Sequence, residues 1–297
     1  MRLAVTGKNG QIVSALQALA CDDLEIVALG RPELDLARPE TVLQALREAR
    51  PDVVVSAAAY TAVDKAESES DIAFATNRDG AKAVALAASD LGIPIIHLST
   101  DYVFDGEKTT AYVESDPTGP RSVYGQSKLE GEKAVSAATD NYAILRTAWV
   151  YSQYGNNFVK TMLRLGETRD EINVVADQFG CPTSANDIAG AIVTIAQRLA
   201  QDASTRLRGI FHLSGTGETS WAVFAKQIFA ISAENGGKPV IINDITTAQY
   251  PTPARRPGNS RLDCSKLEEV YGIRLPDWQT STRAVVTALA QSKKEKP

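Results

Sequence analysis

The first half of the chain alternates short apolar segments with longer segments of helical periodicity, and this alternation constrains the fold more than any other feature. Strands are predicted at residues 2–6, 24–29, 52–56, 93–99 and 142–147, and helices are predicted to begin between them at Gly10, Pro39, Asp71 and Val123. Continuous apolar strands such as Val53-Val54-Val55 are typical of a parallel sheet covered on both faces. Repeated strand–helix units give right-handed crossovers. We therefore expect an α/β fold with a doubly wound parallel sheet of the Rossmann type.

A glycine turn follows the first predicted strand. It reads Thr6-Gly7-Lys8-Asn9-Gly10-Gln11 and runs directly into the first predicted helix. Glycines there let the backbone approach a pyrophosphate, which is bound by free N–H groups and the positive end of the helix dipole. A G-x-x-G segment can also be a simple tight turn. Its place at the end of the first strand of a βαβ series instead predicts a dinucleotide site that includes Gly7, Gly10, Gln11 and Ile12.

The alternation loosens after residue 151. Residues 210–213 predict one more strand of the sheet, residues 156–166 and 219–235 predict helices, and residues 246–261 form a long segment rich in Pro and Arg. We expect a dinucleotide-binding domain at residues 1–151, with elements near residues 172–213 returning to it. Residues 152–297 are expected to form mainly a smaller, substrate-binding lobe.

The composition is that of an ordinary globular protein, with 44% hydrophobic and 23% charged residues. A net charge of −5 argues against nucleic-acid binding, because such proteins present a basic face. No apolar stretch approaches the ~18 residues of a membrane helix. Three cysteines without C-x-x-C spacing indicate reduced thiols in a cytoplasmic protein, and two histidines are too few for a histidine-based metal site.

The run Tyr124-Gly125-Gln126-Ser127-Lys128 predicts an acid–base pair. On a helix, Tyr124 and Lys128 lie one turn apart on the same face, so both can address one ligand. A free phenol titrates near pH ~10, and an ammonium beside it is expected to lower that pKa toward the range of a general acid. The spacing is common by chance. Here, however, Thr100 and Asp101 follow the fourth strand at its carboxyl end, where ligands bind in open α/β sheets, and without the pair they would indicate only a local turn.

Together, the glycine turn, Thr100 and the Tyr124–Lys128 pair resemble the extended short-chain dehydrogenase/reductase family. Residues 57–67, 146–151 and 250–260 are similar to a branch of that family that acts on nucleotide sugars, and the resemblance covers nearly the whole chain. It implies reduction of the C4 keto group of dTDP-4-dehydro-L-rhamnose to dTDP-L-rhamnose, with NADPH or NADH as cofactor. Related 4,6-dehydratases carry Glu where this chain has Tyr102, so dehydration is disfavoured.

The resemblance implies roles for individual residues. Tyr124 is the implied proton donor, Lys128 holds the cofactor ribose, and Thr100 steadies the substrate oxygen. Further cofactor contacts are implied at Arg31, Asp35, Leu36, Ala57, Ala58, Ala59 and Thr61. Substrate contacts are implied at Thr100, Asp101, Trp149, Arg255 and Arg256. The alternative for Trp149 is core packing, and the alternative for the two arginines is a pair of surface charges.

Two positions depart from the family's cofactor pattern. Val13 replaces a third glycine that serves close helix–strand packing, so we expect the helix to shift slightly outward while the phosphate site remains. Gly30 stands where an NAD-specific enzyme carries an acidic residue, and the following Arg31 suits the 2′-phosphate of NADPH. NADPH is therefore the favoured cofactor and NADH the alternative. The other interpretation of Arg31 is a solvated surface charge.

A metal-bridged dimer is not expected. Some relatives dimerise around Mg²⁺ held by glutamates at positions matching Ala15 and Asn186, and neither residue offers a carboxylate. We expect a monomer or a weak, metal-independent dimer, with a small-molecule nucleotide sugar as its partner. Two rival hypotheses stay open. One is a non-catalytic regulatory subunit of the same fold, such as that of methionine adenosyltransferase; the other is an epimerase or dehydratase acting on another nucleotide sugar.

Overall fold

The apolar segments of the N-terminal half pair into one parallel sheet. The computed structural model describes residues 1–294, and its main strands are β1 (Arg2–Thr6), β2 (Glu25–Leu29), β3 (Val53–Ser56), β4 (Ile95–Thr100), β5 (Tyr142–Thr147) and β10 (Gly209–His212). Their order is β2-β1-β3-β4-β5-β10, and every neighbouring pair is parallel. The winding reverses between β1 and β3, which opens a crevice at their carboxyl ends. The predicted doubly wound parallel sheet is confirmed, including the strand expected at residues 210–213.

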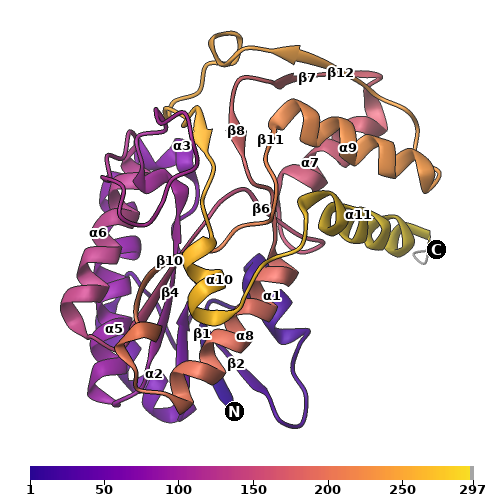
Figure 1. Cartoon of the computed structure of the whole chain (residues 1–297). Helices are drawn as coiled ribbons and strands as arrows, with labels where there is room; N and C mark the ends of the chain where they lie inside the picture. Colours follow the sequence, from indigo (N-terminus) through magenta and orange to yellow (C-terminus); the bar gives the residue numbers. More distant parts are fainter. Residues whose placement is uncertain (295–297) are drawn as a thin grey trace.

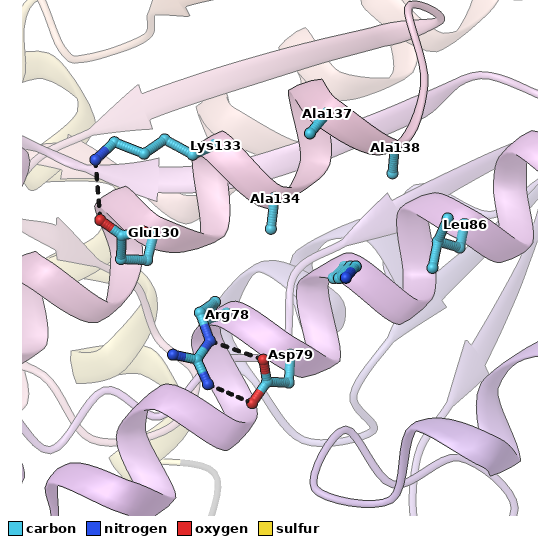
Figure 2. A pocket seen from close by; sticks show the side chains of 9 residues that line it. Arg78, Asp79, Leu86, Glu130, Lys133, Ala134, Ala137 and Ala138 are labelled. Atoms are coloured by element: carbon cyan, nitrogen blue, oxygen red, sulfur yellow. Dashed lines mark hydrogen bonds and ion pairs between the residues drawn. The ribbon is translucent and has the colours of Figure 1, made fainter.

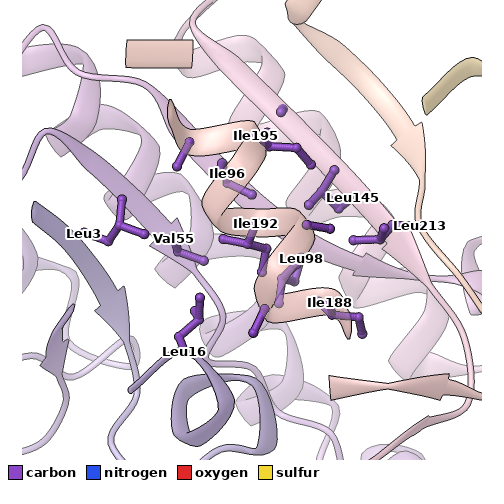
Figure 3. Close-up of a cluster of buried hydrophobic side chains, with 14 of the residues drawn as sticks. Leu3, Leu16, Val55, Ile96, Leu98, Leu145, Ile188, Ile192, Ile195 and Leu213 are labelled. Atoms are coloured by element: carbon purple, nitrogen blue, oxygen red, sulfur yellow. The ribbon is translucent and has the colours of Figure 1, made fainter. Parts of the chain in front are cut away.

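Helices cover both faces of the sheet because successive strand residues point to opposite sides. One face packs against α1 (Gln11–Gln17) and α8 (Ala185–Gln201), and Figure 3 shows Leu3, Val55 and Ile96 facing the helical residues Leu16, Ile188 and Ile192. The other face packs against α2 (Val42–Ala49), α5 (Ala81–Asp90) and α6 (Val123–Ala138). Each fully buried aliphatic side chain contributes about 1.5–3 kcal/mol, so the two-sided core makes the sheet a firm base for the loops at its edge.

Short helical elements complete this lobe. They are η1 (Pro39–Thr41), α3 (Val63–Ala66), α4 (Ser70–Phe74), the π-helix η2 (Ala75–Gly80) and η3 (Asp101–Val103). Two glycines let α6 approach its neighbours closely. A Cβ atom on Gly131 would lie 2.2 Å from the carbonyl oxygen of Asn77 in η2, and one on Gly125 would lie 2.3 Å from that of Tyr102 in η3. Any larger residue would push α6 away from the end of β4.

The smaller lobe lies above and to the right of the sheet in Figure 1. Its larger elements are α7 (Phe158–Thr168), β7 (Glu171–Val175), α9 (Trp221–Glu234), β12 (Ile241–Ile245) and α11 (Trp278–Lys294). Its short strands are β6 (Val150–Tyr151), β8 (Phe179–Gly180), β9 (Thr183–Ser184), β11 (Thr219–Ser220) and β13 (Asn259–Ser260). Its remaining helical turn is η5 (Thr247–Gln249), whereas η4 (Thr205–Leu207) and α10 (Ser265–Tyr271) pack against the core of the parallel sheet.

The chain passes more than once between the two lobes. β7 pairs with β12 in the smaller lobe, whereas α8 and β10, which follow β7, return to the sheet. The smaller lobe has its own apolar core, in which Phe224, Ile228 and Trp278 are buried. Within residues 1–294, no helix is both long and apolar enough to cross a membrane.

Candidate active site

Tyr124 and Lys128 lie on the buried face of α6, in its first two turns. The hydroxyl of Ser122 accepts a hydrogen bond from the Gly125 N–H at 3.1 Å and caps the helix. Tyr124 is 9% exposed and Lys128 only 3%. Lys128 Nζ donates to the carbonyl oxygen of Leu98 on β4 at 2.6 Å. The helix therefore delivers a phenol and an ammonium group to the carboxyl end of β4.

Thr100 and Asp101 complete a buried polar cluster there. The Thr100 hydroxyl donates to Asp101 Oδ1 at 2.9 Å and accepts from the Tyr102 N–H at 3.3 Å, and Tyr124 lies beside Thr100 and Asp101. Burial raises the pKa of Asp101 to about 6, while hydrogen bonds from Ser260 and Thr100 oppose the rise. The structure thus brings together four residues that the sequence predicts for the site: Thr100, Asp101, Tyr124 and Lys128.

The pKa of Tyr124 moves in the direction opposite to the sequence-based expectation. Burial raises it above its ordinary value, the charge of Asp101 raises it further, and the hydrogen bond with Thr100 opposes both. Lys128 makes no contribution to this shift, and its ammonium group donates to the Leu98 carbonyl. The expectation that Lys128 makes the phenol more acidic is wrong for this structure, in which Tyr124 holds its proton firmly.

A buried ion pair lies directly behind Lys128. Glu132, one turn further along α6, accepts two hydrogen bonds from Arg146 on β5, at 2.9 and 2.7 Å, and one from the Ser99 hydroxyl at 2.5 Å. Burial lowers the pKa of Lys128 to about 8, and the charge of Glu132 opposes this change. Sequence reasoning missed Glu132, although its position four residues after Lys128 places it on the same helical face.

Asn77 in the π-helix η2 is a second residue that the sequence analysis missed. Its Oδ1 accepts from the Tyr60 N–H at 2.8 Å, and its Nδ2 donates to the Tyr60 carbonyl at 3.1 Å and to the Ser127 hydroxyl at 2.9 Å. Ser127 in turn donates to the carbonyl of Tyr124. Asn77 therefore fixes the loop after β3 to the helix that carries Tyr124. No sequence motif marked it, since the contacts depend on the π-turn.

The predicted pyrophosphate turn lies at the crevice between β1 and β3. The Thr6 hydroxyl accepts hydrogen bonds from the N–H groups of Ala57 and Ala58 at 3.0 and 2.9 Å, which joins the ends of these strands. Gly7 has a φ of 100°, a conformation that glycine adopts without strain. Gly10 is the N-cap of α1, and no side chain caps the helix. The N–H groups at the start of α1 therefore have no side-chain partner at this crevice.

The three residues after Gly10 make contacts within the protein. The Gln11 Oε1 accepts from the Ser152 hydroxyl at 2.8 Å and from Asn157 Nδ2 at 2.9 Å, so this side chain joins the turn to the smaller lobe. Ile12, in the first turn of α1, packs against the core, and Val13 is buried beneath the glycine turn.

Arg31 is exposed at the end of β2, and a second basic residue lies beside it. Lys8 Nζ donates to the Arg31 carbonyl at 3.1 Å and forms an ion pair with Glu33 at 2.6 Å. A Cβ atom on Gly30 would lie 3.0 Å from Cγ of Lys8, so the lysine side chain fills the space that an acidic residue would need. The sequence predicted no role for Lys8, although it lies within the glycine turn.

The other residues predicted for the cofactor lie in the segments that follow β2 and β3. The Asp35 carboxylate accepts from the Ala37 N–H at 3.1 Å, and Leu36 is 6% exposed in the core. Ala59 is half-buried after β3, and Thr61 is exposed. Asp35 and Leu36 therefore shape the loop, while the side chain of Thr61 faces solvent.

On the substrate side, Trp149 follows β5 and stacks on Trp221 at the start of α9. The ring centroids are 3.5 Å apart and the ring planes differ by 10°. Trp149 is partly buried and contacts the apolar clusters of both lobes. Sequence reasoning missed Trp221, which carries no motif of its own.

The two predicted diphosphate arginines have different surroundings. Arg256 Nη2 pairs with Asp64 at 2.6 Å, and its Nη1 donates to the Tyr102 hydroxyl at 3.1 Å. The Tyr102 ring meets the Tyr124 ring edge-on at 5.5 Å, so Arg256 lies one side chain away from the cluster. Arg255 is exposed and pairs with Glu107 at 3.2 Å. The structure thus brings Arg256, but not Arg255, next to the polar cluster.

The positions that hold Mg²⁺ in some relatives have no acidic residue here. Ala15 is buried in the core, and the Asn186 side chain exchanges hydrogen bonds with Gln153. Among residues 1–294, no three His, Cys, Asp or Glu side chains gather in an arrangement that would hold a metal ion.

An open groove lies elsewhere, over η2, α5 and the outer side of α6. Arg78 pairs with Asp79 and Lys133 with Glu130 along it (Figure 2). None of the residues predicted for the site lines this groove. The charged residues named here are paired with each other, and the groove is separate from the polar cluster.

Comparisons with known proteins agree over nearly the whole chain. A family model described as "RmlD substrate binding domain" matches residues 1–291. The chain is 64% identical over 289 residues to a dTDP-4-dehydrorhamnose reductase of Sinorhizobium fredii, covering 97% of this chain and 98% of that one. It is 40% identical to the dTDP-4-dehydrorhamnose reductase of Escherichia coli K12, with 97% and 98% covered. The crystal structure of the Bacillus anthracis dTDP-4-dehydrorhamnose reductase in complex with NADP matches with a TM-score of 0.89 at 36% identity, covering 96% of this chain and 98% of that one.

Proposed function

Because the chain belongs to the RmlD substrate binding domain family, we propose that its polar cluster reduces a nucleotide sugar and that Tyr124 supplies the proton. The reaction is the NADPH- or NADH-dependent reduction of the C4 keto group of dTDP-4-dehydro-L-rhamnose to dTDP-L-rhamnose. The family resemblance seen in the sequence is confirmed. One observation carries the proposal at the site: a buried phenol, Tyr124, lies beside Thr100 and Asp101 at the carboxyl end of β4, with Lys128 one turn away on the same helix.

The turn between β1 and α1 fits a dinucleotide. Gly7 and Gly10 leave the backbone uncovered, and the first N–H groups of α1 have no side-chain cap that would compete with a pyrophosphate. We assign the 2′-phosphate of NADPH to Arg31 and Lys8, which lie beside each other after β2 and β1; Lys8 also pairs with Glu33, and no acidic residue occupies position 30. We assign the ribose and adenine contacts to residues 57–59, Thr61, Asp35, Leu36 and Lys128. When bound, the cofactor supplies the hydride.

Tyr124 is suited to give a proton in the reducing direction. A phenol with a raised pKa is fully protonated at neutral pH, so the donor is present before each turnover. The alkoxide left on the sugar after hydride addition is a much stronger base and takes the proton. The Thr100 hydroxyl lies beside Tyr124 and steadies the same oxygen once its proton turns from Asp101 to the substrate.

The remaining substrate contacts are assigned to residues that border the polar cluster. Asp101 is a buried carboxyl group that suits a sugar hydroxyl, and the indole of Trp149 suits the apolar face of a deoxysugar. Arg256 and Arg255 are assigned to the diphosphate, because guanidinium groups match phosphate oxygens. Arg256 lies closer to the cluster and would exchange part of its bonding to Asp64 for the diphosphate.

We further propose a division of labour between the two lobes. Residues 1–151, joined by α8 and β10, hold the cofactor, and the rest of residues 152–297 holds mainly the sugar nucleotide. The proposed setting is the cytoplasm, and the proposed assembly is a monomer or a weak, metal-independent dimer without nucleic-acid partners.

The direct test is incubation of the purified protein with NADPH and dTDP-4-dehydro-L-rhamnose. We expect NADPH oxidation that depends on the sugar nucleotide, with dTDP-L-rhamnose identified by NMR as the product. Tight NADPH binding without turnover would instead support a regulatory subunit. A product changed at a carbon other than C4 would support an epimerase or a dehydratase.

A further inference from the structure

The backbone of Trp149 is held in an unusual conformation. Its φ of 50° lies in the left-handed region, which large side chains rarely adopt unless their surroundings impose it. Among residues 1–294, Arg50 is the other non-glycine residue with positive φ, and it is the C-cap of α2, where a left-handed residue is common. Trp149 instead lies between β5 and β6, so its conformation has another cause.

One part of that cause is Trp221. Its indole lies parallel to that of Trp149, with centroids 3.5 Å apart, and Phe158 packs against its ring at 4.6 Å. Trp221 is itself fixed as the first residue of α9, whose N-cap Ser220 accepts a hydrogen bond from the Val223 N–H at 3.3 Å. The face of Trp149 therefore rests on a side chain that cannot easily move.

The second part is Gly180 on β8. A Cβ atom there would lie 2.5 Å from Cε2 and 2.7 Å from Nε1 of Trp149, so only glycine leaves room for the indole edge. Gly180 pairs with Thr219 of β11 on one side and with Ser260 of β13 on the other. Ser260 lies beside Asp101, whose pKa it lowers. One small sheet of the smaller lobe thus borders both Trp149 and the polar cluster.

From these three observations we infer that Trp221 and Gly180 are positioning residues that fix the plane of Trp149 against the sugar ring of the nucleotide-sugar substrate. This inference rests on the proposed function, in which Trp149 contacts the deoxysugar. A ring held in one plane presents a flat apolar surface at little entropy cost, which favours a sugar face without a hydroxyl group at that position. The small sheet β11-β8-β13 then acts in substrate selection, although neither residue is assigned a contact with the reacting atoms.

The test compares Trp221→Ala, Trp221→Phe and Gly180→Ala with the full-length wild type. Trp221→Ala should raise KM for the sugar nucleotide by about tenfold, with a smaller change in kcat, because it removes an aromatic support rather than the proton donor. Trp221→Phe should restore most of the loss. Gly180→Ala should raise KM while keeping both indoles. Val223→Ala, an exposed change on the same helix, is the matched control and should leave KM unchanged.

Two further measurements separate positioning from a general structural role. The stacked indoles should give an exciton couplet in far-ultraviolet circular dichroism, which Trp221→Ala and Trp221→Phe abolish and Gly180→Ala weakens. The Kd for NADPH should stay at the wild-type value in all variants. If Trp221→Ala does not fold, Gly180→Ala decides the question.

A Gly180→Ala variant with a weakened circular dichroism couplet but an unchanged KM for the sugar nucleotide would overturn the inference. So would a variant whose affinity for NADPH falls as much as its affinity for the sugar nucleotide. Wild-type protein that fails to reduce dTDP-4-dehydro-L-rhamnose would contradict the proposed function instead. The two failures are therefore distinguishable.

Discussion

Tyr124, the proposed proton donor, has a pKa that is shifted by burial and by Asp101 rather than by Lys128. Burial and the charge of Asp101 raise its pKa, and Lys128 is turned toward the Leu98 carbonyl. A reduction needs a donor that is protonated when the substrate arrives, and a raised pKa guarantees this at neutral pH. The proposed role of Lys128 is therefore to bind the cofactor ribose through its charge and its hydrogen bonds. The two members of the Tyr124–Lys128 pair therefore have separate tasks.

Replacing Tyr124 by Phe should lower kcat by roughly 10²-fold or more and leave the Kd for NADPH unchanged, because only the proton donor is lost. Steady-state kinetics and fluorescence titration measure the two quantities. Tyr102→Phe is the matched control, since this neighbouring phenol meets Tyr124 edge-on and is bound to Arg256. A Tyr124→Phe variant with near-wild-type kcat would contradict the assignment.

The pKa of Lys128, lowered to about 8 by burial, predicts an alkaline limit to activity. Its ammonium group is present below that pH and is lost above it, so kcat/KM should decline as pH rises through about 8. Lys128→Arg should have lower activity but no such decline, because a guanidinium does not titrate there. A pH profile of kcat/KM from 6 to 10 measures this. Identical alkaline limbs in both proteins would assign the decline to another group.

Arg31→Ala should weaken NADPH more than NADH, since only NADPH carries the 2′-phosphate. An exposed contact of this kind is worth on the order of 1 kcal/mol. Arg38→Ala is the control, because Arg38 is an exposed arginine in the same loop that pairs with Glu40. The KM values for both cofactors should be compared in the two variants. Equal changes for NADPH and NADH in Arg31→Ala would show that Arg31 is only a surface charge.

At the scale of elements, the sequence predicted what depends on local pattern and missed what depends on distant contacts. Apolar runs predicted the parallel strands, and four-residue spacing predicted the pair on α6. The sign of the Tyr124 pKa change depends on Asp101 and on burial, which only the folded chain provides. Arg256 meets Asp64 across 192 residues, and no local pattern encodes that contact. Asn77 acts through a π-turn, which hydrophobic periodicity does not reveal.

Two strands of the sheet carry buried histidines that limit stability in acid. Burial lowers the pKa of His97 on β4 well below 6.5, and that of His212 on β10 to about 3. Above pH 6.5 both are neutral in either state. Below it, the unfolded chain binds protons that the folded protein excludes, so the free energy of unfolding falls by up to ~1.4 kcal/mol per pH unit for each histidine. Asp101 opposes part of this fall, because its pKa of about 6 lets the folded protein bind a proton first.

We therefore expect stability to fall between pH 6.5 and 4.5, and to fall less steeply in His212→Gln. Urea unfolding at several pH values gives the slopes, and slopes rather than absolute stabilities are compared because the substitution also changes packing. A slope identical to that of the wild type would show that His212 does not control the acid sensitivity.

At the scale of the whole molecule, three distant segments meet around the polar cluster. Helix α3, which follows β3, holds Arg256 through Asp64, and the N–H of Tyr112 donates to the carbonyl of Arg261 at 2.8 Å. Ser260 reaches Asp101 from the same C-terminal segment. The smaller lobe therefore contacts the sheet lobe at the polar cluster. A movement between the lobes would first change the surroundings of Asp101 and Tyr102.

Chelation should leave both activity and oligomeric state unchanged. Ala15 lies in the core and Asn186 is engaged with Gln153, so neither offers the carboxylate that Mg²⁺ requires. Size-exclusion chromatography with light scattering, with and without EDTA, measures the assembly. A dimer that dissociates on chelation and re-forms with Mg²⁺ would show that other residues supply the ligands.

The late position of β10 has a consequence for synthesis. β5 pairs with β4 on one edge and with β10 on the other, yet residues 148–208 must be made before β10 exists. While the ribosome translates them, the outer edge of an apolar strand has no partner, and such edges invite pairing with other chains. A translational pause within residues 148–208 is therefore more hazardous than one after His212, when the sheet can close.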